Sequence, residues 1–391
     1  MQILIANLGS TSFKFKLFDL SSGENVIASG AADRIGNPPS SWSVETAEGG
    51  KSGEADLADH GAAIELFMGE LDLSRLDAIG FKAVHGGPIS GAVVVDEQVI
   101  ATMQRFADVA PAHNPPYIAA MQAFAEKLPG VAQVAAFETA FHQTIPLKRQ
   151  AYATPYEWIE KLGVRRYGFH GASHRYIATR MAEIAPDCRR IINCHLGGSS
   201  SICAIEDGRS VATSMGMTPQ TGLPQSGRVG DFDTYALLKL NAAGINTDDA
   251  LKTLGKQGGL LGLSGVSSDM REIEHAAAQG NERAQLALDV FVESLRHYIG
   301  AYMAVTNGVD AICFTGGIGQ NGKAIRAAAM AGFDYAGIVI DLSKNESAKG
   351  SAESRIDADG SKVQVWVLPT NEELIVARQT AEAVAANVTT N

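Results

Sequence analysis

The side chains best suited to chemistry are histidines that lie beside glycine. His170 and His174 stand four residues apart in the segment 167–174. Two histidines at this spacing on a helix can bind a metal, but Gly171 follows the first, so we expect His170 to precede a helix and His174 to lie inside it. The glycine-flanked turn makes His170 the candidate for an active-site donor. Metal binding is the less favoured alternative, because no third ligand stands at a suitable spacing.

Charged side chains occur in glycine-rich loops and next to strand ends. Arg228 lies between glycines in a loop expected over residues 215–233, where a guanidinium can bind a phosphoryl or carboxylate group with two hydrogen bonds. Glu138 follows a predicted strand, and Glu372 and Glu373 open a predicted helix. Mg²⁺ that accompanies ATP is usually held by one or two carboxylates, although the helix pair could equally serve as charge opposite the helix dipole.

Two turns rich in glycine and serine recur, at residues 7–12 (Asn-Leu-Gly-Ser-Thr-Ser) and 195–200 (His-Leu-Gly-Gly-Ser-Ser). Each follows one apolar segment and precedes another, which predicts a β-hairpin at each place. Such turns expose N–H groups and hydroxyls that suit phosphate oxygens. The repeat therefore predicts two copies of one domain with a nucleotide between them, against the alternative of two coincidental hairpins. A third glycine-rich segment, 316–321, fits a nucleotide site at a helix N-terminus but is not a Walker A motif.

The elements that must position these residues alternate between strands and helices, which predicts an α/β architecture. Strands are predicted over residues 2–6, 13–19, 78–84, 131–137, 191–195, 200–206, 209–214, 311–315 and 363–368. Helices are predicted over residues 56–70, 97–109, 117–127, 173–184, 282–305 and 372–385, the last with Asn371 as N-cap. Asp207-Gly208 predicts a tight hairpin turn. We expect two domains, 1–145 and 146–391, with the final helix, about 371–391, packing back on the first.

Composition limits the partners of the chain. It has 391 residues and a net charge of −11, so it lacks the basic field that nucleic acid or an anionic membrane would need. The four cysteines fit neither a zinc site nor a disulfide scaffold, which favours a reducing cytoplasm. The first residues do not form a signal peptide, and no apolar run approaches the roughly 18 residues of a membrane span.

Taken together, the motifs resemble the acetokinase family of short-chain carboxylate kinases. The resemblance runs nearly from end to end, through residues 7–12, 110–116, 137–144, 167–174, 214–219, 265–271 and 370–374. It implies a duplicated actin/Hsp70/hexokinase-like (ribonuclease H-like) fold with an interdomain nucleotide cleft, and a homodimer. It also implies reversible transfer of phosphate from ATP, with Mg²⁺ or alternatively Mn²⁺, to acetate or another short carboxylate, giving acetyl phosphate and ADP.

The resemblance also implies residue roles. The catalytic residues are His170, Arg228, Glu138 and Lys82, and the metal residues are Asn7 and Glu372. The acid pocket is formed by Lys82, Val84, Ala112, His113, Phe169, Pro219 and Arg228. The nucleotide is bound by Ser12, Lys14, His195, Leu196, Gly197, Gly198, Ser199, Asp269, Met270, Arg271, Gly317, Ile318, Gly319, Gln320 and Asn321. The expected mechanism is direct in-line transfer without a general base, because a carboxylate is already a nucleophile at pH 7.

The chain departs from the usual family pattern at four positions, where Lys82 replaces Arg, Glu138 replaces Asp, Gly198 replaces Asn and Ala112 replaces Leu. The smaller Ala112 opens the pocket toward propionate, whereas Val84 argues for acetate. The alternatives are therefore a propionate or butyrate kinase, a pyrophosphate-dependent acetate kinase, and a catalytically impaired relative. From another class, an actin/Hsp70-like ATPase without carboxylate kinase activity is the alternative.

Overall fold

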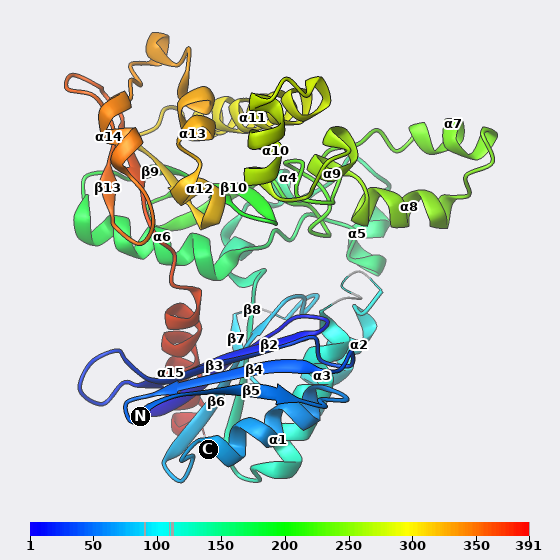
Figure 1. The fold of residues 1–391 in the computed structure, drawn as a ribbon, viewed down its shortest axis with the longest axis vertical. Coiled ribbons are helices and arrows are strands. Elements are labelled where there is room, and N and C mark those ends of the chain that lie inside the picture. Colours follow the sequence, from blue (N-terminus) through cyan, green and yellow to red (C-terminus); the bar gives the residue numbers. More distant parts are fainter. Residues whose placement is uncertain (90, 109, 111–112, 391) are drawn as a thin grey trace. The chain divides into compact units, whose positions relative to one another are not determined.

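The computed structural model describes residues 1–89, 91–108, 110 and 113–390, and the chain forms two compact units (Figure 1). Unit 1 comprises Met1–Phe141 and Asn371–Asn391, and unit 2 comprises His142–Thr370. Each unit is built on one β-sheet with its own hydrophobic core. No helix in the described ranges is both long and apolar enough to cross a membrane.

The sheet of unit 1 has eight strands in the order β5-β4-β3-β2-β1-β6-β8-β7. Strands β1, β2 and β3 are antiparallel neighbours, while β1, β6 and β8 run parallel to one another. The strands are β1 (Gln2–Leu8), β2 (Ser12–Asp19), β3 (Asn25–Asp33), β4 (Ser40–Thr46), β5 (Gly49–Ala55), β6 (Leu76–Ala83), β7 (Ala92–Val94) and β8 (Ala132–Phe137).

The sheet of unit 2 has six strands in the order β11-β10-β9-β12-β14-β13. They are β9 (Arg190–Leu196), β10 (Ser200–Glu206), β11 (Arg209–Thr213), β12 (Ala311–Thr315), β13 (Ser354–Arg355) and β14 (Gln364–Val367). The hairpin turn between β10 and β11 has positive φ at both Asp207 and Gly208, as the dipeptide predicted.

The two sheets share one topology. In each, a three-stranded antiparallel meander is followed by two parallel strands and a short antiparallel edge strand, so that β3-β2-β1-β6-β8-β7 matches β11-β10-β9-β12-β14-β13. The two repeated glycine/serine turns occupy equivalent places, since one joins β1 to β2 and the other joins β9 to β10. The predicted duplication of one α/β domain is therefore confirmed.

Helices cover both faces of the sheet in unit 1. Helices α1 (His60–Glu70) and α3 (Asn114–Lys127) pack with one face, where Phe67 and Phe124 lie in the core beside Phe13. Helix α15 (Glu372–Thr390) packs on β1, β6, β7 and β8, and its red ribbon lies beside that sheet in Figure 1. A Cβ atom at Gly80 of β6 would overlap Thr380 Oγ1 of α15 and come within 3.3 Å of Val376. The glycine thus allows the closing helix to approach the strand.

In unit 2 the longest helix, α11 (Glu282–Val305), spans the residues predicted for it, and its buried Phe291, Leu295 and Ile299 belong to the same core as Ile192 of β9. The other helices of this unit are α4 (Leu147–Gln150), α5 (Tyr156–Leu162), α6 (Gly171–Ile184), α7 (Ala236–Ala242), α8 (Thr247–Lys256), α9 (Gly259–Ser264), α10 (Met270–Ala278), α12 (Gly316–Asn321), α13 (Lys323–Met330) and α14 (Leu342–Ser347).

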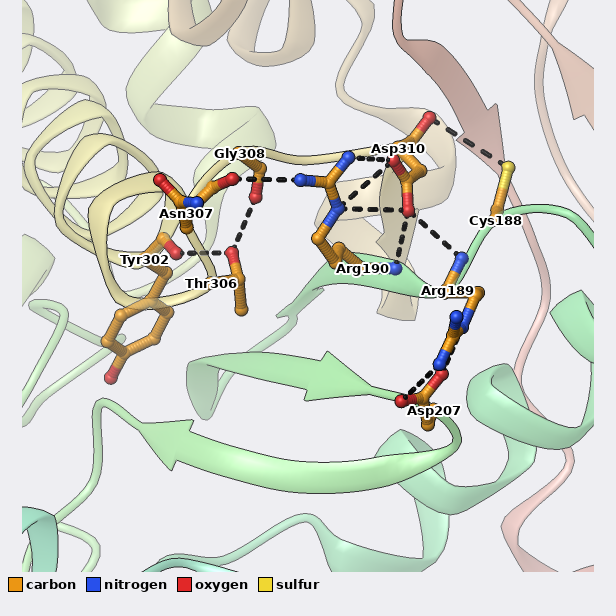
Figure 2. A network of polar contacts seen from close by, with 9 residues as sticks. All are labelled: Cys188, Arg189, Arg190, Asp207, Tyr302, Thr306, Asn307, Gly308 and Asp310. Atoms are coloured by element: carbon orange, nitrogen blue, oxygen red, sulfur yellow. Dashed lines mark hydrogen bonds and ion pairs between the residues drawn. The ribbon is translucent and has the colours of Figure 1, made fainter.

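A polar network joins the starting ends of β9 and β12 (Figure 2). The Asp310 carboxylate accepts hydrogen bonds from the backbone N–H groups of Arg189 (3.0 Å) and Arg190 (2.8 Å) and pairs with the Arg190 guanidinium. That guanidinium also donates to the Asn307 carbonyl at 2.8 Å. The network aligns two parallel strands whose opposite ends carry His195 and the glycine-rich segment of α12.

Several predicted boundaries are wrong. The helix predicted from residue 56 begins at His60 after Asp59 as its N-cap, because residues 49–55 form β5. The helix predicted over 97–109 is α2 (Glu97–Arg105), and the helix predicted from 117 begins at Asn114. The strands β3, β4 and β5 were not predicted.

Candidate functional site

In unit 1 three charged side chains meet where β6 and β8 end and α15 begins. Lys82 Nζ lies 3.4 Å from Glu138 Oε1 and pairs with Glu372 Oε2. Parallel pairing of Lys82 with Ala136 brings the ends of the two strands together, so that Glu138 follows directly beside Lys82. All three side chains are largely buried, with 7–19% of each exposed.

The lysine of this group stays charged. Burial lowers the pKa of Lys82, but the Glu372 and Glu138 carboxylates outweigh it and hold the pKa well above its ordinary value. The ammonium therefore neutralises only one of the two carboxylates. Its predicted contact with a substrate carboxylate stays a prediction, since in the structure its partners are Glu138 and Glu372.

The same end of unit 1 carries an amide and a phenol. Ala6 of β1 pairs in parallel with Phe81 of β6. The residues that follow them, Asn7 and Lys82, therefore lie beside each other. The Tyr117 hydroxyl accepts from the Leu8 N–H at 3.0 Å and donates to Asn7 Oδ1 at 3.4 Å. This hydrogen bond orients the Asn7 amide.

These oxygen donors fit a hard divalent cation. Mg²⁺ prefers carboxylate and amide oxygens, and it keeps several waters or phosphate oxygens as ligands. Two carboxylates, with an amide oxygen near them, match a site of this kind. Among the described residues no group of three or more His, Cys, Asp or Glu is arranged to hold a metal ion, so a metal bound here would also need ligands from a substrate or water.

In unit 2 the histidines gather at the start of α6 and the end of β9. His170 is the N-cap of α6 with a left-handed φ of 58°, and His174 lies inside the helix, as predicted. The ring of His170 stacks on that of His195, with 4.2 Å between centroids. Ser201 Oγ lies 2.8 Å from His170 Nδ1 and 2.9 Å from His174 Nε2. The left-handed conformation turns the His170 ring toward this group.

Arg228 contrasts with Lys82. Its guanidinium donates to Ser199 Oγ (3.1 Å), Gln225 Oε1 (3.1 Å) and the Pro219 carbonyl (3.4 Å), all of which are neutral. Within the described ranges no carboxylate pairs with Arg228, and burial lowers its pKa. A half-buried guanidinium with neutral partners retains its charge for an anion.

The loop around Arg228 is held by backbone hydrogen bonds. Gly258 N–H donates to the Gly227 carbonyl at 3.0 Å, and Val229 N–H donates to the Leu254 carbonyl at 3.0 Å. Ser226 N–H donates to the Gly198 carbonyl at 3.1 Å, which links this loop to the turn after β9. The side chain is therefore presented from a fixed backbone.

A cavity of about 540 Å³ lies beside that turn. It is lined by Gly197, Gly198, Ser226, Ser268, Asp269, Met270, Arg271, Glu274, Gly317, Ile318, Asn321 and Gly322. Eight of these residues were predicted to bind the nucleotide. A Cβ at Gly317 would meet nothing within 4 Å, and one at Gly198 would lie 3.5 Å from Ser226 Oγ, so neither glycine is crowded by its neighbours. The volume suits a small-molecule ligand.

The other predicted nucleotide residues lie elsewhere. Leu196 and Gly319 are buried in unit 2, and the side chain of Leu196 belongs to the hydrophobic core. Gln320 donates to the Gly350 carbonyl at 2.7 Å. Ser12 and Lys14 lie on β2 of unit 1, and Lys14 is exposed.

Of the predicted acid-pocket residues, Phe169 is buried in unit 2, and Pro219 lies on the loop that carries Arg228. In unit 1, Val84 packs against the core, and His113 precedes α3 as its N-cap. Ala112 lies outside the described residues.

Sequence reasoning missed the polar residues that hold the site together, namely Asn193, Ser201, Gln225 and Ser226. Asn193 has a recognisable signal, because it is a polar residue within the apolar run of β9 and is fully buried. A buried amide needs a partner, and here that partner is His174.

Comparisons with known proteins agree with one another. Residues 2–378 match the model of the acetokinase family. An acetate kinase of Natranaerobius thermophilus is 42% identical, with 97% of this chain and 98% of that protein covered.

Two crystal structures are also similar to this chain. The acetate kinase of Porphyromonas gingivalis has a TM-score of 0.90 at 39% identity, and 98% of this chain and 99% of that chain are covered. A propionate kinase of Francisella tularensis has a TM-score of 0.91 at 34% identity, with 97% and 99% covered.

Proposed function

This chain belongs to the acetokinase family, and from that premise we propose that it acts as an acetate kinase, transferring a phosphoryl group reversibly from ATP to acetate to give acetyl phosphate and ADP. The observation that carries the proposal is the similarity to an acetate kinase over nearly the whole of both chains. The duplicated α/β topology agrees with the actin- and hexokinase-like fold expected for this family.

The residues of unit 2 suit the nucleotide and the transferring phosphoryl group. The glycine-lined cavity beside Gly197, Gly198 and Gly317 takes ATP or ADP, with backbone N–H groups directed at phosphate oxygens. Arg228 binds the anionic groups that react, because no carboxylate neutralises it in the part of the chain that the structure describes. His170 donates a hydrogen bond to the transferring phosphoryl group and stabilises the charge that gathers on its oxygens.

The residues of unit 1 suit the metal. Glu372 and Glu138, with Asn7, hold Mg²⁺ or Mn²⁺, and Lys82 keeps the two carboxylates in position. When bound, the cation neutralises charge on the transferring phosphate. No general base is required, because acetate is already ionised at pH 7.

The acid that receives the phosphoryl group distinguishes two candidate functions. Val84, Phe169 and Pro219, with His113, are proposed to surround the acid. Propionate kinase is the second candidate, because the propionate kinase of Francisella tularensis is about as similar in structure as the acetate kinase. One methylene changes selectivity by only about 1–3 kcal/mol.

The reverse reaction tests the phosphate donor. Purified protein is given acetyl phosphate with either ADP or inorganic phosphate, and ATP or pyrophosphate is measured. ATP formation supports the proposal. Pyrophosphate formation without ATP would establish a pyrophosphate-dependent enzyme. If neither product forms, and the protein slowly hydrolyses ATP in a separate assay, it would instead be an actin-like ATPase.

We also propose a cytoplasmic homodimer, with unit boundaries at residues 141/142 and 370/371 serving as the domain boundaries. Apolar side chains exposed on and near α7 and α8, namely Tyr235, Leu238 and Leu251, suit a protein contact. Light scattering on the eluting protein should give twice the chain mass of 41.1 kDa. The mass of a single chain at micromolar concentration would contradict the dimer.

A further inference from the structure

A continuous line of hydrogen bonds leads from β9 to His170. Asn193 Nδ2 lies 2.8 Å from His174 Nδ1. His174 Nε2 lies 2.9 Å from Ser201 Oγ, and Ser201 Oγ lies 2.8 Å from His170 Nδ1. Asn193, His174 and Ser201 are each fully buried, whereas His170 is half-buried at the head of α6.

The chemistry of these groups determines which atom donates and which accepts in each hydrogen bond. The Asn193 amide nitrogen can only donate, so His174 Nδ1 must accept. A neutral His174 then carries its proton on Nε2 and donates to Ser201. The hydroxyl has a single hydrogen, so Ser201 accepts from His174 and donates to His170 Nδ1. The His170 proton is therefore placed on Nε2.

Two further observations support this direction. Burial, with the neighbouring His142 and His195, lowers the pKa of His174 well below its ordinary value, so His174 is neutral at pH 7. The reverse orientation would place the amide nitrogen of Asn193 at the buried position of Oδ1, which has no hydrogen-bond partner among the residues that the structure describes. Buried N–H groups without partners are rarer than buried carbonyl oxygens without partners.

We propose that Asn193, His174 and Ser201 are positioning residues that fix His170 as the Nε2–H tautomer, with Nε2 as its hydrogen-bond donor. This inference rests on the proposed function, in which His170 donates to the transferring phosphoryl group. It adds that the hydrogen-bond donor of His170 is fixed before substrate binds. The buried hydrogen-bonded chain of Asn193, His174 and Ser201, which we call the relay, does not itself touch substrate. Preorganised donors of this kind need no rearrangement during the reaction.

Nuclear magnetic resonance tests the tautomers directly. Protein labelled with ¹⁵N at histidine is studied at pH 8, where histidines are mostly neutral, and long-range ¹H–¹⁵N spectra report which ring nitrogen bears hydrogen. The signals of His170 and His174 are assigned with His170→Asn and His174→Gln. The relay predicts hydrogen on Nε2 and none on Nδ1 in both rings. Hydrogen on Nδ1 of either ring would overturn the proposal.

Variants at His174 give a second readout. Glutamine places an N–H near the position of histidine Nε2 and keeps the donor to Ser201, whereas His174→Met removes it at similar size. Without that donor, Ser201 can accept from His170 Nδ1, so part of His170 takes the Nδ1–H form. We expect His174→Met to lower kcat about 10²-fold with KM values nearly unchanged, and His174→Gln to retain most of kcat.

The controls keep the outcomes distinct. If His174→Met fails to fold, Ser201→Ala against Ser201→Thr repeats the comparison, since threonine keeps the hydroxyl. Equal kcat in the donor-retaining and donor-removing variants, or His170 spectra that do not change, would contradict the relay. If the wild type makes no acyl phosphate, the proposed function fails, while the histidine spectra still decide the inference.

Discussion

At the scale of single residues, the two cations predicted to act on substrate have opposite surroundings. Lys82 is paired with two carboxylates, whereas among the described residues the Arg228 guanidinium donates to Ser199, Gln225 and Pro219, which are neutral. Arg228 is therefore the cation available to an incoming anion, and Lys82 is already compensated.

Replacing Arg228 tests that assignment. Arg228→Ala removes the charge that we propose binds the phosphoryl and carboxylate oxygens, and kcat for acetyl phosphate formation should fall about 10²–10³-fold. Arg228→Lys should recover part of the lost kcat, because a lysine keeps the positive charge but lacks the planar guanidinium that makes two parallel hydrogen bonds. Lys161→Ala, at an exposed pair with Glu157, is the matched control and should match the wild type. An unchanged kcat in Arg228→Ala would remove Arg228 from the mechanism.

Adjacent glutamates at the start of α15 allow a sharp test of the metal site. Glu372 pairs with Lys82, while Glu373 pairs with Lys16 at 3.4 Å. Glu372→Gln should weaken Mn²⁺ binding at least about tenfold, measured by electron paramagnetic resonance with ADP present. Glu373→Gln should bind Mn²⁺ as the wild type does. Equal affinities in the two variants would exclude Glu372 as a ligand.

Much of the site was predictable at this scale, and the reason differs between residues. Glycine-flanked His170 and Arg228 stand out, because chemistry and backbone freedom coincide in the sequence. The Lys82–Glu372 pair joins residues far apart in the chain, which only the packing of α15 on β6 brings together. Ser201 carries no signal of its own, since serine is common in strand-turn-strand segments.

At the scale of elements, the packing of α15 on β6 determines where Glu372 lies. Gly80 provides the room, because a Cβ there would overlap Thr380. Helix α15 and the central strands of unit 1 therefore depend on one small residue.

Gly80→Ala should destabilise unit 1 by about 1–3 kcal/mol, because added volume in a packed interface forces the helix away. Urea unfolding is monitored by the fluorescence of Trp42, the tryptophan of unit 1, after Trp158 and Trp366 are replaced by phenylalanine. Gly69→Ala is the control, since a Cβ there meets nothing within 4 Å and alanine favours a helix by about 1 kcal/mol over glycine. Equal stability of Gly80→Ala and the wild type would contradict the close contact.

The elements that the sequence predicted are those with strong apolar patterns. The repeated hairpins and α11 have such patterns, and they were found. Strands β3 and β5 were not, because Asn25–Asp33 and Gly49–Ala55 are rich in glycine, alanine, serine and charge. Their pairing depends on the neighbouring strands β2 and β4, which local residues do not reveal.

At the scale of the whole molecule, one topology serves two tasks. In unit 1 the strand ends carry the oxygen donors that we propose hold a metal, and in unit 2 the matching strand ends carry His195 and the glycine-lined cavity. The opposite ends of the unit 2 strands are held by Asp310 and Arg190 (Figure 2).

Acid should loosen unit 2 through Asp310. Burial raises the pKa of Asp310, but hydrogen bonds from Arg190 and Arg189 outweigh it and hold the pKa below its ordinary value of 3.8. The stabilisation is therefore complete above about pH 4 and is lost as the pH falls through the lower, folded-state pKa. Asp310→Asn should lower the free energy of unfolding by about 2 kcal/mol at pH 7. Between pH 7 and pH 3, that free energy should fall less in Asp310→Asn than in the wild type. An identical acid dependence in both proteins would contradict this role.

Formation of acyl phosphate from ATP and a carboxylic acid tests the proposed activity most directly. Purified protein, Mg²⁺ and ATP are mixed with formate, acetate, propionate or butyrate, and the acyl phosphate is trapped with hydroxylamine and measured as hydroxamate. We expect rapid hydroxamate formation with acetate, less with propionate and butyrate, and little with Arg228→Ala. No hydroxamate with any acid, from protein that demonstrably binds ATP, would contradict it.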